Sequence, residues 1–339
     1  MSNVTFADVQ TAEKRISPFI NKTPVLESQL LNSWLGHKIM FKAECFQRTG
    51  AFKLRGALNM LLRAKEDGRL GTHVVASSSG NHAQAVAYAA KILGVSATIF
   101  SAHNVSKVKA AATQYYGATL DLSATRKEAD EKVAEAAKKE GVLWMPPFNH
   151  NDIIAGQGTA ALEALKQTGE VDSVFAPVGG GGLVSGSLIS TKALFPMASV
   201  IGVEPLIAND AAESIRSGVI QSLPGQPNTL ADGAATLQVG EKTFPHLQAL
   251  DGFYEVDETK IAYWTQWLQH LLKIHVEPTC AMSMGAVVEW LKSQSREQKS
   301  EQKSQQKVLV MLSGGNIDQQ KMLKIWHHDH LQQVPSLLI

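Results

Sequence analysis

Short apolar runs, often β-branched, alternate with longer helical patterns along most of this 339-residue chain. Such alternation is typical of parallel sheets covered by helices, with right-handed crossovers between strands. We expect strands over 38–43, 73–77, 97–101, 118–122, 142–145, 173–178, 199–204 and 307–312. We expect helices between them over 55–66, 81–93, 126–140, 156–167 and 183–194. The pattern therefore predicts an α/β fold with mostly parallel sheets.

Clusters of glycine or serine follow three of the expected strands, at 77–80, 179–182 and 313–315. In parallel α/β sheets, ligands bind beyond the carboxyl ends of the strands. We therefore expect these three turns to meet at one shared site.

Four consecutive glycines, at 179–182, separate an apolar run from a helical run. Without Cβ atoms, their N–H groups can point inward and bind a phosphate at the helix N-terminus. The chain has no GxxxxGK[ST] pattern, and no acidic residue ends a second strand at the distance that the dinucleotide fingerprint requires. A tight turn without a ligand is the alternative interpretation.

The loop at 77–82 also has two interpretations. It could bind a carboxylate at a helix N-terminus, or it could simply cap that helix.

Composition excludes several other functions. The net charge of +1 gives no electrostatic basis for nucleic-acid binding. No apolar stretch of about 18 residues is present, so we expect no membrane contact. The polar start of the chain does not resemble a signal peptide, and the two cysteines have no disulfide or zinc spacing. We therefore expect a cytoplasmic protein.

The segment RTGAFKLRGA, at 48–57, resembles the lysine motif of the serine/threonine dehydratase and serine racemase family. These are pyridoxal-phosphate (PLP) enzymes of fold type II, the tryptophan-synthase-β-like fold. The resemblance covers nearly the whole chain, and its further motifs follow in family order. They are SSGNHAQ (78–84), IAGQGT (154–159), GGGGLVSG (179–186), TLADG (229–233), EPT (277–279) and SGGN (313–316).

The resemblance implies that Lys53 binds PLP as a Schiff base and later removes the α-proton of the substrate. A buried lysine has a lowered pKa, which suits this chemistry. Phe52 is implied to pack beside the cofactor ring and Asn81 to bind its hydroxyl. Ser313 is implied to meet the pyridine nitrogen and leave it neutral, which favours loss of a β-hydroxyl. The phosphate is implied to bind the backbone of Gly179, Gly180, Gly181, Gly182 and Leu183.

The substrate carboxylate is implied to bind in the loop that holds Ser78, Ser79, Asn81 and His82. Ser79 matches the serine that faces the lysine in racemases of this family, although dehydratases often carry it too. Arg126 matches an arginine that closes over the substrate, but it could also be a solvated arginine at a helix start. The resemblance thus implies a dehydratase (ammonia-lyase) that converts L-serine, L-threonine or 3-hydroxyaspartate into a 2-oxo acid and ammonia.

Three alternatives stay open. A serine or aspartate racemase would use Lys53 and Ser79 as its two bases. The loop at 146–151, PPFNHN, lacks a serine run and shifts the balance towards the dehydratase. A β-replacement enzyme is disfavoured by the lysine motif and the tetraglycine, and a non-catalytic PLP-binding protein by the intact Lys53.

A second cluster suggests a metal site. Glu204 and Asp210 lie six residues apart with the Ala208 carbonyl between them, and such oxygen ligands suit Mg²⁺, Mn²⁺ or Ca²⁺. Racemases of the family and some of its dehydratases carry this spacing, whereas the alternative is a surface loop whose aspartate caps the next helix. The resemblance also implies a homodimer and two domains. Residues 1–70 and 150–339 would form the large PLP-binding domain, and 71–149 a small domain that closes over the substrate.

Overall fold

A computed structural model describes residues 4–78, 80–103, 105, 107–297 and 305–337. Its larger sheet has six strands in the order β1-β2-β10-β7-β8-β9, all parallel except β1, which runs antiparallel to β2. These strands are β1 (Val25–Glu27), β2 (Lys38–Ala43), β7 (Ser173–Pro177), β8 (Ser199–Pro205), β9 (Gly252–Val256) and β10 (Lys307–Leu312).

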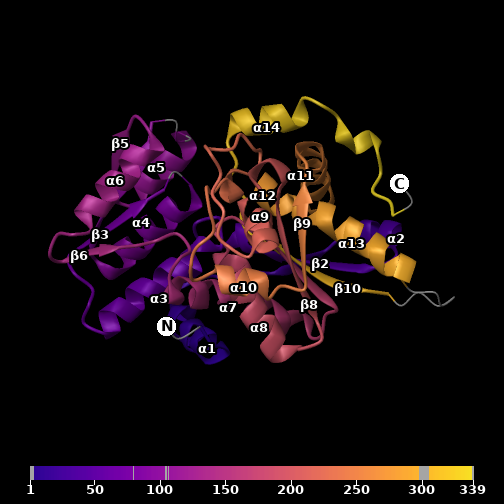
Figure 1. The fold of residues 1–339 in the computed structure, drawn as a ribbon, viewed down its shortest axis with the longest axis horizontal. Helices are drawn as coiled ribbons and strands as arrows, with labels where there is room; N and C mark the ends of the chain where they lie inside the picture. Colours follow the sequence, from indigo (N-terminus) through magenta and orange to yellow (C-terminus); the bar gives the residue numbers. More distant parts are fainter. Residues whose placement is uncertain (1–3, 79, 104, 106, 298–304, 338–339) are drawn as a thin grey trace.

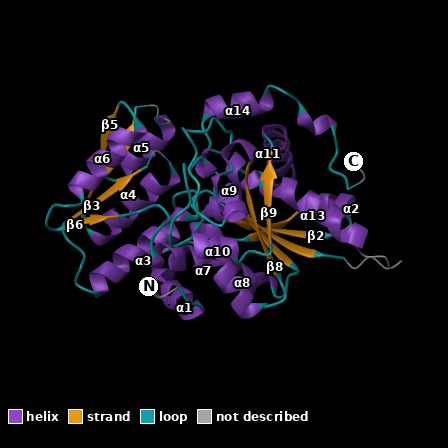
Figure 2. Cartoon of the chain, in the orientation of Figure 1, coloured by secondary structure: helices purple, strands orange, loops and turns teal. Residues whose placement is uncertain are grey.

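The smaller sheet has four parallel strands in the order β5-β4-β3-β6. They are β3 (His73–Ser77), β4 (Ser96–Ala102), β5 (Thr119–Ser123) and β6 (Val142–Trp144). Figure 2 shows the two sets of strands on opposite sides of the molecule. All four strands of the smaller sheet come from the segment 71–149, which we expect to form the small domain. The division into two domains stays a prediction.

Helices connect the strands and surround both sheets (Figure 1). From the N-terminus to the middle of the chain they are α1 (Phe6–Ile16), α2 (Gln29–Leu35), α3 (Lys53–Glu66), α4 (Asn81–Leu93), α5 (Lys107–Tyr115), α6 (Arg126–Ala136) and α7 (Asn151–Thr168). They continue as α8 (Gly182–Leu194), α9 (Asp210–Ser217), α10 (Phe244–Gln248), α11 (Glu258–Leu272), α12 (Pro278–Ala281), α13 (Ser283–Glu297) and α14 (Gln319–Trp326). No helix in these ranges is long and apolar enough to cross a membrane.

The larger sheet is buried on both faces because successive side chains of a strand point in opposite directions. In β10, Val308 and Val310 face a core built with α11 and α13, whereas Leu309 and Met311 face a core built with α7 and α8. This two-sided burial explains why the strand appears in the sequence as a continuous apolar run. The predicted α/β class with mostly parallel sheets is confirmed.

The expected elements lie close to the observed ones, with two differences in helix length. Helix α6 ends at Ala136, four residues early, because the N–H groups of Lys138 and Lys139 bond three residues back instead of four. Helix α7 begins at Asn151, five residues early, because His150 Nδ1 accepts a hydrogen bond from the first-turn N–H of Asp152. The short strands β1 and β9 were not expected.

Candidate active site

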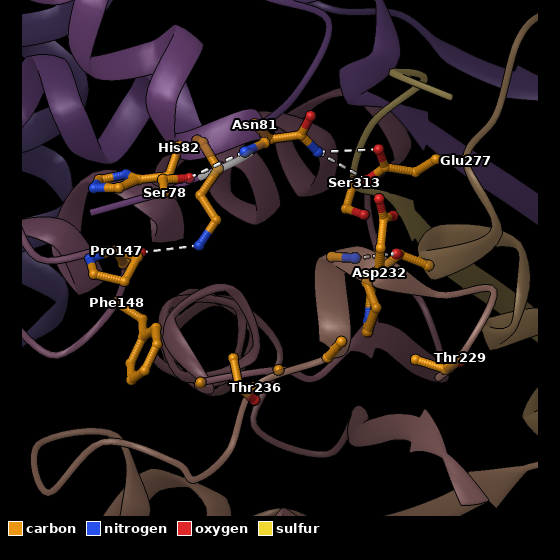
Figure 3. Close-up of a pocket in the computed structure, with 18 of the residues that line it drawn as sticks. Ser78, Asn81, His82, Pro147, Phe148, Thr229, Asp232, Thr236, Glu277 and Ser313 are labelled. Carbon is orange, nitrogen blue, oxygen red and sulfur yellow. Dashed lines mark hydrogen bonds between the residues drawn. The ribbon is translucent and has the colours of Figure 1, made fainter. Parts of the chain in front are cut away.

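A cavity of about 590 Å³ lies where the carboxyl ends of the strands from both sheets meet. Its wall includes the starts of α3, α4 and α8 and the turn after β10. Figure 3 shows Ser78, His82 and Pro147 on one side of this cavity and Glu277, Ser313 and Asp232 on the other. The three glycine- or serine-rich turns expected to meet do line one site.

Lys53, the first residue of α3, is partly buried in this wall. Its Nζ donates a hydrogen bond of 2.9 Å to the Pro147 carbonyl and lies 5.1 Å from the centre of the Phe52 ring. Burial lowers the pKa of Lys53 to about 8, although the nearby Glu277 carboxylate opposes the shift. A lysine with this pKa supplies a neutral, nucleophilic amine far more readily than an exposed one.

The backbone fixes the position of Lys53 against the turn after β10. The Phe52 N–H donates to the Ser313 carbonyl at 3.0 Å, and Ala51 forms an isolated antiparallel bridge with Gly314. The backbone that precedes Lys53 is thus held at a fixed separation from that of Ser313. The Ser313 hydroxyl is buried and has no hydrogen-bond partner within the described ranges. A buried orphan hydroxyl is costly, so it fits a ligand that hydrogen-bonds there, such as the ring nitrogen of PLP.

The glycine loop joins β7 to α8. Gly181 has a φ of +91°, a left-handed conformation that favours glycine, and α8 begins at the next residue. A Cβ on Gly180 would lie 2.2 Å from carbon atoms of the Phe148 ring. Thr243 Oγ1 donates to the Gly180 carbonyl at 2.7 Å, which fixes the loop through its carbonyl oxygen. The loop therefore has no room for side chains and presents a helix N-terminus to the cavity, where a phosphate is stabilised.

Asn81, at the start of α4, has both ends of its side-chain amide engaged. Its Nδ2 lies 3.0 Å from each carboxylate oxygen of Glu277, and its Oδ1 accepts a 2.9 Å hydrogen bond from Asn316 Nδ2. Burial raises the pKa of Glu277 to about 7, while Lys109 and the Asn81 hydrogen bond act in the opposite direction. Sequence reasoning found Asn81 but did not find that Glu277 and Asn316 orient it. Both lie in quoted motifs, EPT and SGGN, to which no such contact had been assigned.

The loop before α4 is the one expected to bind the substrate carboxylate. The Ser78 hydroxyl accepts hydrogen bonds from the N–H groups of Gly80 and Ala83, both at 3.2 Å, so it supports the helix start. His82 is buried, with its Nε2 2.9 Å from the Met145 carbonyl, and burial lowers its pKa to about 3. His82 is therefore neutral and structural. Ser79 lies outside the residues that the structure describes.

Arg126, the first residue of α6, also lines the cavity. Its Nε donates to both oxygens of Asp130, at 3.0 and 3.2 Å, and its Nη2 donates to the Ser77 carbonyl at 3.4 Å. The side chain is 44% exposed. Arg126 is thus both partly solvated at a helix start and placed at the cavity.

The structure brings Glu204 and Asp210 together away from this cavity. Glu204 accepts the N–H groups of Ala211 and Ala212 at 3.2 and 2.7 Å, so the glutamate, and not the aspartate, caps α9. Asp210 Oδ2 is buried and has no hydrogen-bond partner in the described part of the chain. Burial raises the pKa of Glu204 to about 9, helped by Asp210, and raises that of Asp210 to about 7. With the buried Ala208 in the turn between them, these oxygens are chemically suited to a divalent cation.

A cluster that sequence reasoning missed lies on the cavity wall. Asp232 Oδ2 accepts from Lys109 Nζ and from Lys321 Nζ, each at 2.9 Å. The three residues come from α5, from the turn Asp232–Ala234 and from α14. Asp232 belongs to the quoted TLADG motif, but contacts across more than 80 residues leave no signal in a single sequence.

Comparisons with known proteins agree with this geometry. A family model described as "Pyridoxal-phosphate dependent enzyme" matches residues 16–314. The chain is 41% identical to an L-threo-3-hydroxyaspartate ammonia-lyase from Saccharomyces cerevisiae, over 94% of each chain. It is 39% identical to a serine racemase from Dictyostelium discoideum, over 96% of this chain and 98% of the relative. The solved structure of a T.th. threonine deaminase matches with a TM-score of 0.85 and 40% identity, covering 93% of this chain and 99% of that one.

Proposed function

We propose a function from the premise that this chain belongs to the pyridoxal-phosphate dependent enzyme family. The proposed function is that of a dehydratase, which converts a small 3-hydroxy amino acid into a 2-oxo acid and ammonia. The observation that carries this proposal is Lys53, a partly buried lysine whose lowered pKa gives a nucleophilic amine in the cavity that the glycine loop and Ser313 also line. The similarity to ammonia-lyases from yeast and from a Pseudomonas species supports the same reaction class.

The residues present fit the cofactor. Lys53 would hold it covalently, Phe52 would pack beside its ring, and the second amide proton of Asn81 would bind its ring hydroxyl. The orphan hydroxyl of Ser313 would meet the ring nitrogen without protonating it. The bound cofactor supplies an electron sink for the α-carbon of the substrate. The phosphate would bind the backbone N–H groups of Gly179, Gly180, Gly181, Gly182 and Leu183.

The substrate would bind with its carboxylate at the N-terminus of α4, near Ser78, Asn81 and His82. Lys53 would take the α-proton, since its Nζ already lies within the cavity and is basic enough at neutral pH. We propose that the segment 71–149 closes over the substrate, that Arg126 moves with it, and that closure excludes water.

A racemase is the second candidate. The serine racemases that share 39% identity over nearly the whole chain favour it, as does the serine at position 79, opposite Lys53 in the family pattern. Racemisation requires an acid on one face of the substrate and a base on the other, which Ser79 and Lys53 would supply.

We also propose that Glu204, the Ala208 carbonyl and Asp210 bind Mg²⁺, Mn²⁺ or Ca²⁺. A cation would coordinate the Asp210 oxygen that has no hydrogen-bond partner in the described part of the chain. It would also offset the cost of burying two carboxylates together. Millimolar Mg²⁺ should raise the melting temperature of the protein, and Asp210→Asn should remove that response. An unchanged response in Asp210→Asn would refute this site.

Two properties of the whole molecule remain proposals. We expect a homodimer, which the solution mass from light scattering tests directly. The second proposed property is a location in the cytoplasm. Cys45 and Cys280 are both free thiols, which fits the reducing conditions of that compartment.

The function is tested by measuring 2-oxo acid release from L-serine, L-threonine and L-threo-3-hydroxyaspartate. Release from at least one of them by the PLP-loaded protein is the expected result, and Lys53→Ala should show neither turnover nor the visible absorbance of bound cofactor. No release from any of the three, together with inversion of L-serine to D-serine, would replace the dehydratase by the racemase.

A further inference from the structure

The cavity has a cationic cluster that the reaction described above does not use. It consists of Lys109 and Lys321, joined through the Asp232 carboxylate at 2.9 Å on each side. All three side chains line the cavity that holds Lys53. The Lys109 side chain is 8% exposed and that of Lys321 is 22% exposed, so both ammonium groups are largely removed from bulk water.

The charges of this cluster do not cancel internally, because two ammonium groups share one carboxylate. Three other carboxylates line the cavity, and two of them, Glu277 and Asp318, also act electrostatically on Lys109. Asp130 pairs with Arg126, the Asp318 side chain caps α14 by accepting the Lys321 N–H, and Glu277 binds the Asn81 amide. Lysine has three N–H donors. Lys109 uses one of them, on Asp232, in the interactions of the described chain. The cluster can therefore donate to a further anionic group.

The cluster also lies next to the loop that we expect to hold the substrate. A Cβ built on Gly80 would be 3.9 Å from Lys109 Nζ, which places this ammonium beside the loop before α4. Asp232 lies on the same side of the cavity as Glu277 and Ser313 (Figure 3). The cationic cluster thus connects the substrate loop to the opposite wall, within reach of the side chain of a bound amino acid.

We propose that Lys109 and Lys321 bind the distal carboxylate of a dicarboxylic 3-hydroxy amino acid, so that the enzyme prefers 3-hydroxyaspartate to serine and threonine. This specificity rests on the dehydratase function proposed above. A carboxylate in this position receives charge-assisted hydrogen bonds, which are stronger than bonds between neutral groups. Serine and threonine have no such group, so they leave these donors unused.

The test compares two substrates within each of three proteins. We measure kcat/KM for L-threo-3-hydroxyaspartate and for L-serine in the PLP-loaded wild type, in Lys321→Gln and in the control Lys324→Gln. The control removes the same charge from the exposed face of the same helix. In Lys321→Gln we expect the ratio of the two kcat/KM values to fall about 10- to 100-fold, mainly through KM for the dicarboxylate, which is the range for a lost bond to a charged group. The control should keep the wild-type ratio.

A parallel loss on both substrates would overturn the proposal, because it would mean that the cluster only holds the cavity in shape. An unchanged ratio would overturn it as well.

A binding measurement separates this proposal from the reaction itself. L-aspartate and L-alanine carry no β-hydroxyl and cannot undergo the elimination, so their apparent affinities from isothermal titration calorimetry do not depend on that reaction. We expect wild type to bind L-aspartate more tightly than L-alanine, and Lys321→Gln to lose that difference. If wild type shows the difference but forms no 2-oxo acid, the dehydratase function fails while the carboxylate site stands. Equal affinities in wild type would refute the site.

Discussion

Replacing Gly180 by alanine should selectively weaken cofactor binding. The new Cβ would lie 2.2 Å from Phe148 ring carbons, whereas nonbonded carbon atoms pack at about 3.5–4.0 Å. The ring or the glycine loop must therefore move by more than 1 Å, on the order of that difference. Overpacking of this kind costs about 1–3 kcal/mol. If the loop takes up the shift, PLP should bind about 5- to 150-fold more weakly, since a tenfold change in affinity corresponds to about 1.4 kcal/mol.

The assay is a titration of the apo-protein with PLP, followed by visible absorbance. Two further glycines provide a graded series. A Cβ on Gly182 would be 3.2 Å from the Phe148 Cβ, so Gly182→Ala should weaken binding less. A Cβ on Gly225 would have no atom within 4 Å, so Gly225→Ala should bind PLP as the wild type does. If Gly180→Ala keeps wild-type affinity while circular dichroism shows an intact fold, the Phe148 ring and not the glycine loop has taken up the shift, and the expected weakening is refuted.

Three further predictions concern buried charged groups. The rate at which the apo-protein captures PLP should rise with pH and level off above about 8, because burial lowers the pKa of Lys53 and only the neutral amine reacts; a plateau reached only near 10 would contradict this. Arg55→Met should lower the free energy of unfolding in urea by about 3–5 kcal/mol, because it leaves the buried Glu44 carboxylate without its partner at 2.7 Å. The exposed Arg48→Met should change it little. The pKa of the buried His82 is about 3, whereas that of the unfolded chain is near 6.5, so protons bind preferentially to the unfolded state between these values. Stability should therefore fall by up to about 1.4 kcal/mol for each unit that the pH drops below 6.5, and His82→Gln should remove this component of the slope.

The sequence predicted the central strands well because they are buried on both faces. The runs 38–43, 73–77 and 307–312 coincide with β2, β3 and β10. The two strands that it missed lie at the edges of the larger sheet. β1 has only three residues, none of them fully buried, and β9 is only partly buried over most of its length. Edge strands depend on their neighbour for stability and carry little apolar signal of their own.

The same contrast holds for the site. Lys53 and the glycine loop were predicted because their chemistry requires a local pattern, which a single segment can display. The contacts that orient Asn81, and the Lys109–Asp232–Lys321 cluster, join segments more than 80 residues apart. Such pairs are created by the packing of the two sheets and are invisible to a local pattern. Lys109 and Lys321 are also surface-type residues, which would be expected to lie in solvent.

The backbone contact between the Lys53 segment and the Ser313 turn has a consequence for how such a protein can change over time. The groups suited to holding the cofactor, Lys53, the glycine loop and Ser313, are fixed by the framework of the larger sheet, whereas the 78–82 loop and Arg126 belong to the smaller sheet. Mutations in the smaller part, at positions other than Asn81, would therefore alter which amino acid is accepted without disturbing cofactor binding. This division of roles agrees with the similarity of this one chain both to an ammonia-lyase and to a racemase.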